Sequence, residues 1–264
     1  MSFLDVPKRC YSKLPERVRN RLRFLKSPRT VIIHCLVRFC SRNQVIHGPF
    51  KELYLNTSDC YPPMLLGTYE QELHDILYNW FDHDLQNLIC IGAAEGYYAV
   101  GMAKRDPAIN VIAYELDSFQ RSQLAKVIRQ NNVSNITVLK RCTQASLIER
   151  LSSVSSLTYI ICDIEGGEFE LLDPVRVPAL TQAFILVEIH EELVNGCEEV
   201  IRKRFKKSHK IVEIVNSSRK PGDFPSNSRA FRAIFSEKTK LDLMNEGRAS
   251  TMKWLVMEPA SIRN

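Results

Sequence analysis

Short apolar runs alternate with amphipathic stretches through the middle of the chain. The apolar runs are typical of buried strands, which we predict at residues 88–91, 111–115, 136–140, 158–163 and 184–189. Between them, apolar residues recur at helical spacing over about residues 95–105, 118–131, 144–151 and 167–173. Strands that alternate with helices favour a parallel sheet covered on both faces. The pattern therefore predicts an α/β fold.

Weaker patterns flank this central region. Residues 50–55 alternate between polar and apolar side chains like a short strand, and residues 69–80 carry an apolar stripe at helical spacing. Residues 211–215 and 253–257 are two further predicted strands, separated by a polar loop. We expect these last two to add an antiparallel strand at the edge of the sheet.

The N-terminal segment differs from the rest of the chain in pattern and charge. Apolar residues at helical spacing predict one helix over residues 14–25 and a second, more apolar one over about 30–39. Residues 1–50 hold eleven Lys and Arg against two acidic residues, a net charge of +9, while the whole chain carries +6. We therefore divide the chain into a basic helical extension, residues 1–47, and a main domain, residues 48–264.

Two interpretations of the extension remain open. Its basic amphipathic helices could make peripheral contact with an anionic membrane or bind an acidic partner. Alternatively, their apolar face packs on the main domain as a lid and the arginines stay in water, which is the more common use of a charged face.

Composition is that of an ordinary soluble protein. Of the 264 residues, 45% are hydrophobic and 25% are charged. The apolar runs are all far shorter than the roughly 20 residues that span a bilayer, and the first residues lack the apolar core of a signal peptide. The eight cysteines include no Cys-x-x-Cys pair, which disfavours a disulfide framework and a zinc site. We expect a cytoplasmic protein.

The turn after the first central strand is the most informative motif. Gly92 to Gly96 joins that strand to a helix, and Glu115 ends the next strand 19 residues later. In nucleotide-binding βαβ units, such glycines bring the backbone close to the ligand and such an acid accepts hydrogen bonds from ribose. Glu95 inside the turn would repel the diphosphate of a dinucleotide. It suits a cationic nucleoside, for which S-adenosylmethionine is the candidate.

Polar residues follow each of the five central strands, at the sheet edge where α/β proteins bind ligands. In chain order they are Gly92 to Gly96, Glu115 and Asp117, Arg141 to Thr143, Asp163 to Gly166, and Glu188 and His190. Each also has a structural explanation, such as a solvated strand end, a helix cap or a surface histidine. Beside Glu188, His190 becomes a candidate proton acceptor with a pKa near working pH.

Five motifs in this order resemble those of the FkbM-type methyltransferases, over about residues 48–258. They are Thr68-Tyr69-Glu70, Ile-Gly-Ala-Ala-Glu-Gly-Tyr-Tyr at 91–98, Tyr-Glu-Leu-Asp at 114–117, Asp-Ile-Glu-Gly-Gly-Glu at 163–168 and Val-Glu-Ile-His at 187–190. The resemblance implies a class I, S-adenosylmethionine-dependent enzyme, most often an O-methyltransferase. It also implies a Rossmann-like sheet, mostly parallel with an antiparallel edge strand. The predicted N-terminal helical extension, residues 1–47, lies outside the resemblance.

The resemblance also assigns residues to cofactor binding. The methionine part of the cofactor would be lined by Gly92, Ala94, Glu95 and Gly96. Glu115 would hold the ribose with Asp117 nearby, and the turn around Cys142 would flank the adenine. Glu70 would cover the cofactor from the preceding helix, and Asp163 would lie between cofactor and substrate. The chain departs from the family pattern at Cys90, where class I enzymes usually carry an acidic residue. Glu95 is the candidate replacement for that charge.

The implied reaction is methylation of a hydroxyl on a small molecule, sugar or lipid-linked acceptor. Either Asp163 or His190 would act as the base, while Glu165 and Glu188 orient the acceptor. A variant adds magnesium or manganese held by these same residues, because carboxylates and one imidazole suit such ions.

Two other classes of function remain open. The first is a nucleic-acid methyltransferase that uses the basic extension and the run 202–207 to bind phosphates. The chain lacks an Asn-Pro-Pro-Tyr-like motif and an aromatic stacking platform, which disfavours that reading. The second is a non-catalytic binding module, which Cys90 suggests.

Overall fold

The computed structural model describes residues 28–58, 60–83, 85–152, 157–225, 235–248 and 252–260. Its contacts divide the chain into two units. Unit 1 comprises Met1–Gln71 and Ser218–Ser250, and unit 2 comprises Glu72–Ser217 and Thr251–Asn264. The helix predicted over residues 14–25 lies outside the described residues. The division into a basic extension, residues 1–47, and a main domain, residues 48–264, stays a prediction.

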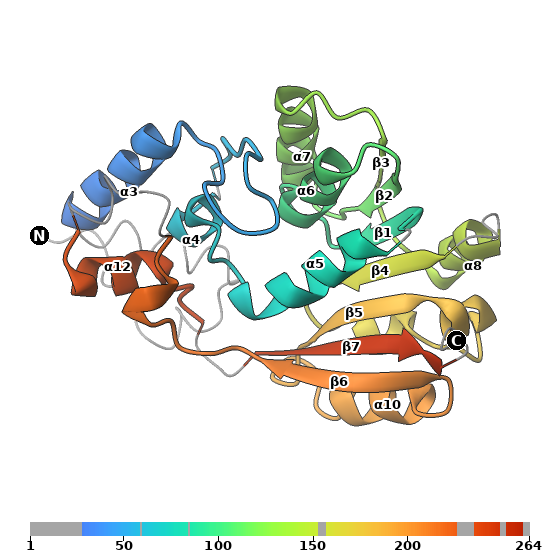
Figure 1. The fold of residues 1–264 in the computed structure, drawn as a ribbon. Helices are drawn as coiled ribbons and strands as arrows, with labels where there is room; N and C mark the ends of the chain where they lie inside the picture. The colour runs from blue at the N-terminus through green and yellow to red at the C-terminus, as the bar shows by residue number, and fades with distance from the viewer. Residues whose placement is uncertain are drawn as a thin grey trace, which may run out of the picture. The chain divides into compact units, whose positions relative to one another are not determined.

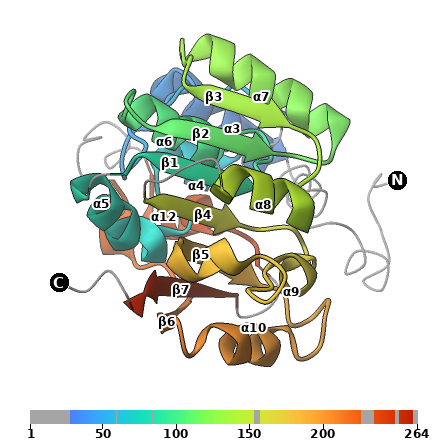
Figure 2. The ribbon, with the colours of Figure 1, turned by 90° about the vertical axis from the view of Figure 1, so that its right-hand side faces the viewer.

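A single mixed sheet forms the centre of unit 2 (Figures 1 and 2). Within the described part of the chain its strands are β1 Asn87–Ile91, β2 Asn110–Tyr114, β3 Ile136–Leu139, β4 Thr158–Cys162, β5 Phe184–Ile189, β6 His209–Val215 and β7 Lys253–Pro259. Their spatial order is β3-β2-β1-β4-β5-β7-β6. The first five strands pair in parallel, and β7 is antiparallel to both β5 and β6. The predicted α/β sheet with an antiparallel edge is confirmed.

Helices pack on both faces of this sheet. They are α5 His74–Asp82, α6 Tyr97–Arg105, α7 Ser118–Gln130, α8 Gln144–Ser152, α9 Glu168–Leu171, the 3-10 helix η2 Pro178–Gln182 and α10 Cys197–Phe205. Alternate strand residues such as Ile89 and Ile160 form one core with buried residues of α8, α9 and α10. The residues between them face the other way, where Tyr159 packs against Trp80 of α5 at 4.8 Å between ring centroids. Burial of every position in β1 and β4 explains their continuous apolar runs.

One predicted element is wrong, and another differs in where it begins. Residues 50–55 form a turn with an isolated bridge between Gln44 and Tyr54 rather than a strand. Backbone hydrogen bonds between Val45 and residues 52 and 53 fold this segment back on itself, so burial alone produced the alternating pattern. The helix predicted over residues 69–80 is confirmed as α5, but it begins later, after the 3-10 turn Gln71–Leu73.

Unit 1 contains α3 Pro28–Ser41, α4 Pro62–Leu66, the 3-10 turn η3 Pro221–Asp223 and α12 Glu237–Met244. Here α3 confirms the helix predicted near residues 30–39. A buried ion pair connects the two segments of the chain that build this unit, and two more lie within the second segment. Glu70 pairs with Arg248, and Glu246 pairs with both Arg248 and Arg219.

Among the described helices of the chain, none combines the length and apolar character that crossing a membrane requires.

Candidate active site

The turn between β1 and α6 has an unusual backbone conformation. Gly92, Ala94 and Gly96 all have positive φ angles, of 84°, 50° and 101°. A Cβ atom on Gly92 would lie 1.8 Å from the carbonyl oxygen of Asp163, so glycine lets β1 and β4 approach closely at their ends. A Cβ on Gly96 would meet Leu124 at 2.6 Å. Packing within the protein therefore accounts for both glycines, where the sequence analysis had invoked ligand approach.

Glu115 follows β2 and is held by the backbone of this turn. Its Oε2 accepts a hydrogen bond from the Ala94 N–H at 2.7 Å, and its Oε1 accepts one from the Asp117 N–H at 2.8 Å. A carboxylate has about four acceptor positions, so two remain for a ligand hydroxyl. The neighbouring Asp117 caps α7, since its Oδ1 accepts from the Gln120 N–H at 2.8 Å.

Two thiols predicted near the cofactor are neutral. Burial raises the pKa of Cys90 far above its usual range, and the negative charges of Asp163 and Glu115 raise it further. These two carboxylates therefore exert a negative potential at the end of β1. Burial also raises the pKa of Cys142 to about 12, partly offset by the hydroxyl of Ser146. Glu95, in the turn itself, is 3% exposed.

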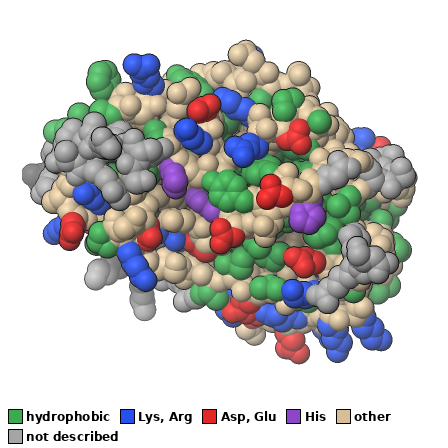
Figure 3. Space-filling view, viewed as in Figure 1, with side chains coloured by type: hydrophobic (Ala, Val, Ile, Leu, Met, Phe, Trp, Pro, Cys, Tyr) green, Lys and Arg blue, Asp and Glu red, His purple; other side chains and the backbone are tan. Residues whose placement is uncertain are grey.

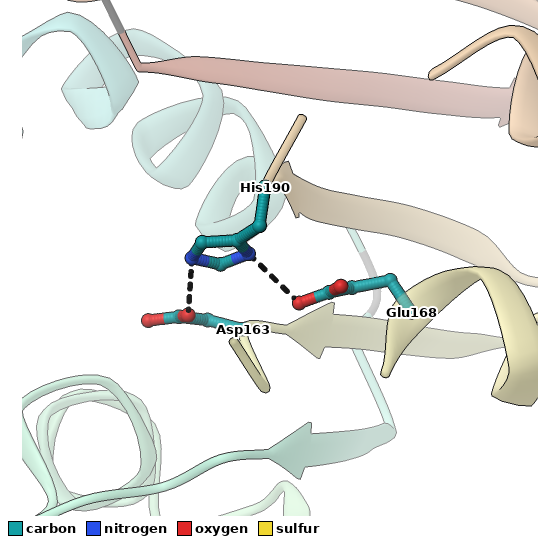
Figure 4. Close-up of side chains that lie close together, drawn as sticks. All are labelled: Asp163, Glu168 and His190. Atoms are coloured by element: carbon teal, nitrogen blue, oxygen red, sulfur yellow. Dashed lines mark hydrogen bonds and ion pairs between the residues drawn. The ribbon is translucent and has the colours of Figure 1, made fainter. Parts of the chain in front are cut away.

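The loops that follow β4 and β5 bring one histidine and four carboxylates together, which we call the His190 cluster. Its members are Asp163, Glu165, Glu168, Glu188 and His190. Because Cys162 pairs with Val187 in neighbouring parallel strands, the residues just after each strand lie side by side. Figure 4 shows the His190 ring between Asp163 and Glu168. The structure thus unites the four residues that the sequence predicted as catalytic.

Distances in the His190 cluster distinguish the two ring nitrogens. Nδ1 lies 2.9 Å from Oε1 of Glu168, a hydrogen-bond distance. Nε2 lies 3.6 Å from Asp163, 3.9 Å from Glu165 and 3.9 Å from Glu188. The side chains of His190, Glu168 and Glu188 are at most 4% exposed, whereas those of Asp163 and Glu165 are 34% and 50% exposed. The cluster is therefore buried on one side and open to solvent on the other.

This environment changes the protonation of His190. Burial disfavours the charged imidazolium, but the hydrogen bond to Glu168 and the negative charges of Asp163, Glu168 and Glu165 outweigh it and raise the pKa to about 9. The sequence had predicted a pKa near working pH. That value is wrong because one histidine faces four carboxylates, and His190 is therefore protonated at neutral pH.

Glu168 is the member of the cluster that the sequence analysis did not assign to the site. Its Oε1 accepts hydrogen bonds from the N–H groups of Ile164 at 3.0 Å and Gly166 at 3.3 Å, besides the one from His190. Burial raises the pKa of Glu168, but the hydrogen bond and charge of His190 outweigh it and hold the pKa below its usual value. An acid in the first turn of a helix is commonly structural. The local sequence therefore gives no signal that Glu168 also holds the His190 ring, which only the 2.9 Å contact shows.

Glu70 lies in unit 1, where its carboxylate pairs with Arg248. Its φ angle of 47° puts it outside the helix on which it was predicted. Its contact with the cofactor stays a prediction.

The strand order with a single antiparallel strand, β7, defines the fold of class I methyltransferases. Solved structures that share this fold include the following two. The "delta-N METTL16 MTase domain" is 16% identical with a TM-score of 0.50, covering 89% of this chain and 97% of that chain. The "Human methyltransferase 10 domain containing protein" is 14% identical with a TM-score of 0.51, covering 85% and 93%. At these identities the likeness shows the fold alone.

Comparison with curated proteins adds a shorter match. The tRNA (guanine-N(7)-)-methyltransferases of Mycobacterium avium (strain 104) and Mycolicibacterium paratuberculosis (strain ATCC BAA-968 / K-10) are each 33% identical over 79 residues. The match spans 30% of this chain and about 30% of the length of either relative. No family model matches the chain.

Proposed function

We propose that this protein is an S-adenosylmethionine-dependent methyltransferase of the FkbM type that methylates a hydroxyl on a small molecule, sugar or lipid-linked acceptor. The observation that carries the proposal is the placement of Glu115, which is held by two backbone N–H groups beside the β1–α6 turn in a class I methyltransferase fold. The methyltransferase names of the relatives matched over 79 residues support the reaction type.

The residues around the turn fit this cofactor chemically. Glu115 has acceptor positions left for ribose hydroxyls, and the carboxylates of Glu95 and Asp163 suit a positively charged sulfonium and amino group rather than a diphosphate. The neutral, half-buried Cys142 would flank the adenine. In this proposal Asp117 acts mainly as the cap of α7.

The bound cofactor would supply a methyl group on a positively charged sulfur, which an acceptor oxygen displaces in line. The protein would align that oxygen and exclude water. Since His190 is protonated at neutral pH, Asp163 is the better candidate to take the hydroxyl proton. His190 would hold Asp163 through their 3.6 Å ion pair, while Glu165 and Glu188 orient the acceptor.

Calorimetry with S-adenosylmethionine tests this proposal. The full chain should bind the cofactor, and Glu115→Gln should weaken binding by about 10- to 100-fold, since it loses hydrogen bonds to a charged acceptor. Glu170→Gln, an exposed carboxylate on α9, is the matched control and should bind like the wild type. An absence of binding by the wild type would favour the non-catalytic alternative.

Methylation of RNA is the second candidate. The matched relatives are named as tRNA methyltransferases, and residues 1–50 are strongly basic. Figure 3 shows basic side chains along the lower edge of one face, over α10 and β6. Part of this basic run is neutralised, because Arg202 pairs with Glu198 and Glu213.

Radiolabelled methyl transfer separates these two substrate classes. We expect label from S-adenosylmethionine to enter a small-molecule, glycan or lipid extract and not total RNA. In the same assay, Asp163→Asn should abolish transfer while cofactor binding persists. Label in RNA would replace the proposed acceptor class with the second candidate.

A further inference from the structure

The solvent-exposed side of α3 in unit 1 consists of apolar side chains (α3 is labelled in Figure 1). Six of the ten residues from 31 to 40 are exposed, and none of the six is charged. They are Val31, Ile32, Cys35, Leu36, Phe39 and Cys40. Because an α-helix has 3.6 residues per turn, these positions cover about half of its circumference. We call them the α3 apolar face.

The largest side chains of the α3 apolar face form one continuous row. Phe39 is 82% exposed, Ile32 is 59% exposed and Leu36 is 43% exposed. Residues three and four apart are neighbours on a helix, so these three side chains lie next to one another. Single exposed apolar residues are common on protein surfaces, but contiguous apolar patches mark interaction sites. The α3 apolar face is therefore a candidate interaction surface.

The arginine of α3 bonds back to the protein instead of covering this face. Arg38 donates hydrogen bonds to Oδ1 of Asn43 at 3.1 Å, to Oδ1 of Asn56 at 2.6 Å and to the carbonyl of Thr57 at 3.2 Å. Val37, on the same side of the helix, is fully buried. A helix that only covers a core presents polar side chains to water. In α3 the water-facing half is apolar, which folding of unit 1 does not require.

The charge of the surrounding sequence indicates the kind of partner. Residues 17–51 contain nine Lys and Arg and no acidic residue, and α3 lies within this stretch. Unit 1 as a whole holds 19 Lys and Arg against 9 acidic residues. Anionic lipids attract such basic segments, and an exposed apolar helix face can enter the boundary between headgroups and acyl chains. Both features occur together at α3.

We infer that the α3 apolar face docks on the surface of a membrane that contains anionic lipids. The helix lies in the plane of the interface with Phe39 and Ile32 among the acyl chains, while the positive charge of residues 17–51 attracts the lipid phosphates. A second copy of the chain fits less well, because it would bring two basic segments together. RNA also fits less well, since RNA recognition uses aromatic stacking and polar contacts rather than aliphatic side chains.

Co-sedimentation of the full chain with lipid vesicles tests this inference. We expect binding to vesicles of phosphatidylcholine and phosphatidylglycerol in equal amounts, at least about tenfold weaker binding to phosphatidylcholine alone, and weaker binding as salt rises. Phe39→Ser should weaken binding to the mixed vesicles about tenfold, and Ile32→Ser combined with Phe39→Ser about 100-fold, because apolar surface no longer leaves water. The matched control is Val175→Ser in unit 2, where Val175 is 86% exposed, and it should bind like the wild type.

A fluorescence measurement shows whether this face itself enters the lipid. The two native tryptophans, Trp80 and Trp254, are at most 5% exposed and so are shielded from a quencher in the bilayer. On mixed vesicles that carry brominated acyl chains, the added fluorescence of Phe39→Trp should be quenched, whereas that of the control Val175→Trp should not. This result distinguishes docking of α3 from binding through residues 1–27 alone.

Three results would overturn the inference: no binding of the wild type to the mixed vesicles, equal binding by the wild type and the double variant, or no quenching of Phe39→Trp. A dimer that Phe39→Ser converts to a monomer in sedimentation velocity would also overturn it, because a second copy would then cover the face. Circular dichroism verifies folding, which substitutions of exposed side chains should leave intact. The vesicle assays contain no S-adenosylmethionine, so their outcome is independent of the proposed function.

Discussion

At the residue scale, the β1–α6 turn shows how packing within the protein selects glycine. Gly92 combines a φ angle of 84° with close approach to the Asp163 carbonyl. Gly196 has a similar φ of 81°, but no atom lies within 4 Å of the position of its Cβ. Gly222 also faces open space, with no positive φ. These three glycines separate the cost of backbone conformation from the cost of steric overlap.

Alanine substitutions at these glycines should lower the free energy of unfolding to different extents. Gly196→Ala should cost about 1 to 2 kcal/mol, the penalty of a left-handed conformation, and Gly222→Ala less than about 0.5 kcal/mol. Gly92→Ala should cost clearly more than Gly196→Ala, because overlap adds to the same backbone penalty. Urea denaturation measures all three. Equal costs for Gly92→Ala and Gly196→Ala would contradict the close packing of β1 against β4.

At the scale of elements, a network of ion pairs in unit 1 joins segments that are far apart in the sequence through the pair of Glu70 with Arg248. Glu70 precedes the 3-10 turn Gln71–Leu73, while Arg219, Glu246 and Arg248 belong to the segment after residue 217. All four side chains are at most 9% exposed. The guanidinium of Arg248 also lies over the ring of Tyr69, 5.7 Å from its centroid. Arg248 is therefore central to the packing of this unit.

Arg248→Ala should lower the free energy of unfolding by about 3 kcal/mol, because it leaves two carboxylates in a buried position without this partner. The control is Arg176→Ala, whose pair with Asp173 is 4.0 Å long and whose side chain is 70% exposed. It should cost less than about 1 kcal/mol. Adding Glu70→Gln to Arg248→Ala should recover part of the loss. If the two arginine variants were equally stable in urea denaturation, the ion pairs would not hold unit 1 together.

At the scale of the whole molecule, charge divides between the units more sharply than the N-terminal segment alone suggested. Unit 1 holds 19 Lys and Arg against 9 acidic residues, and unit 2 holds 17 against 21. The C-terminal segment 218–250 contributes to the basic side of this balance. Unit 1 is therefore basic, whereas unit 2, which contains the His190 cluster, is acidic.

Acid should destabilise the folded protein through the half-buried His34 and the buried His209. Burial and the charge of Arg38 lower the pKa of His34 from 6.5 to about 4, and burial also lowers the pKa of His209. Between pH 6.5 and 4 the unfolded chain binds more protons at His34 than the folded one, so stability is lost as the pH falls. For His34 alone we expect a loss of about 2 kcal/mol.

Urea denaturation at a series of pH values checks this expectation. In the His34→Gln variant, the free energy of unfolding should fall less between pH 6.5 and 4 than it does in the wild type. At pH 8 the two proteins should differ less in stability than they do at pH 4. The exposed His83→Gln is the control and should decline like the wild type. A His34→Gln variant with an unchanged decline would assign the acid sensitivity to other groups.

The sequence by itself determined the strands of the sheet and the edge where the candidate site lies. Buried parallel strands must be apolar throughout, so β1, β2, β4 and β5 were visible as short runs. Because the carboxyl ends of parallel strands share one edge, the sequence also brought Asp163, Glu165, Glu188 and His190 together. These inferences need only the local pattern of apolar residues and the rule that the carboxyl ends of parallel strands share one edge of the sheet.

Only the tertiary structure decided how these side chains interact. The partnership of Glu168 with His190, and the resulting rise in pKa, depend on distances between two loops that no local pattern encodes. Likewise, Gly92 is required by a carbonyl 71 residues later in the chain, and Glu70 is paired with an arginine near the other end. Electrostatic and steric effects act through space, so their outcome was fixed by the fold and not by spacing along the chain.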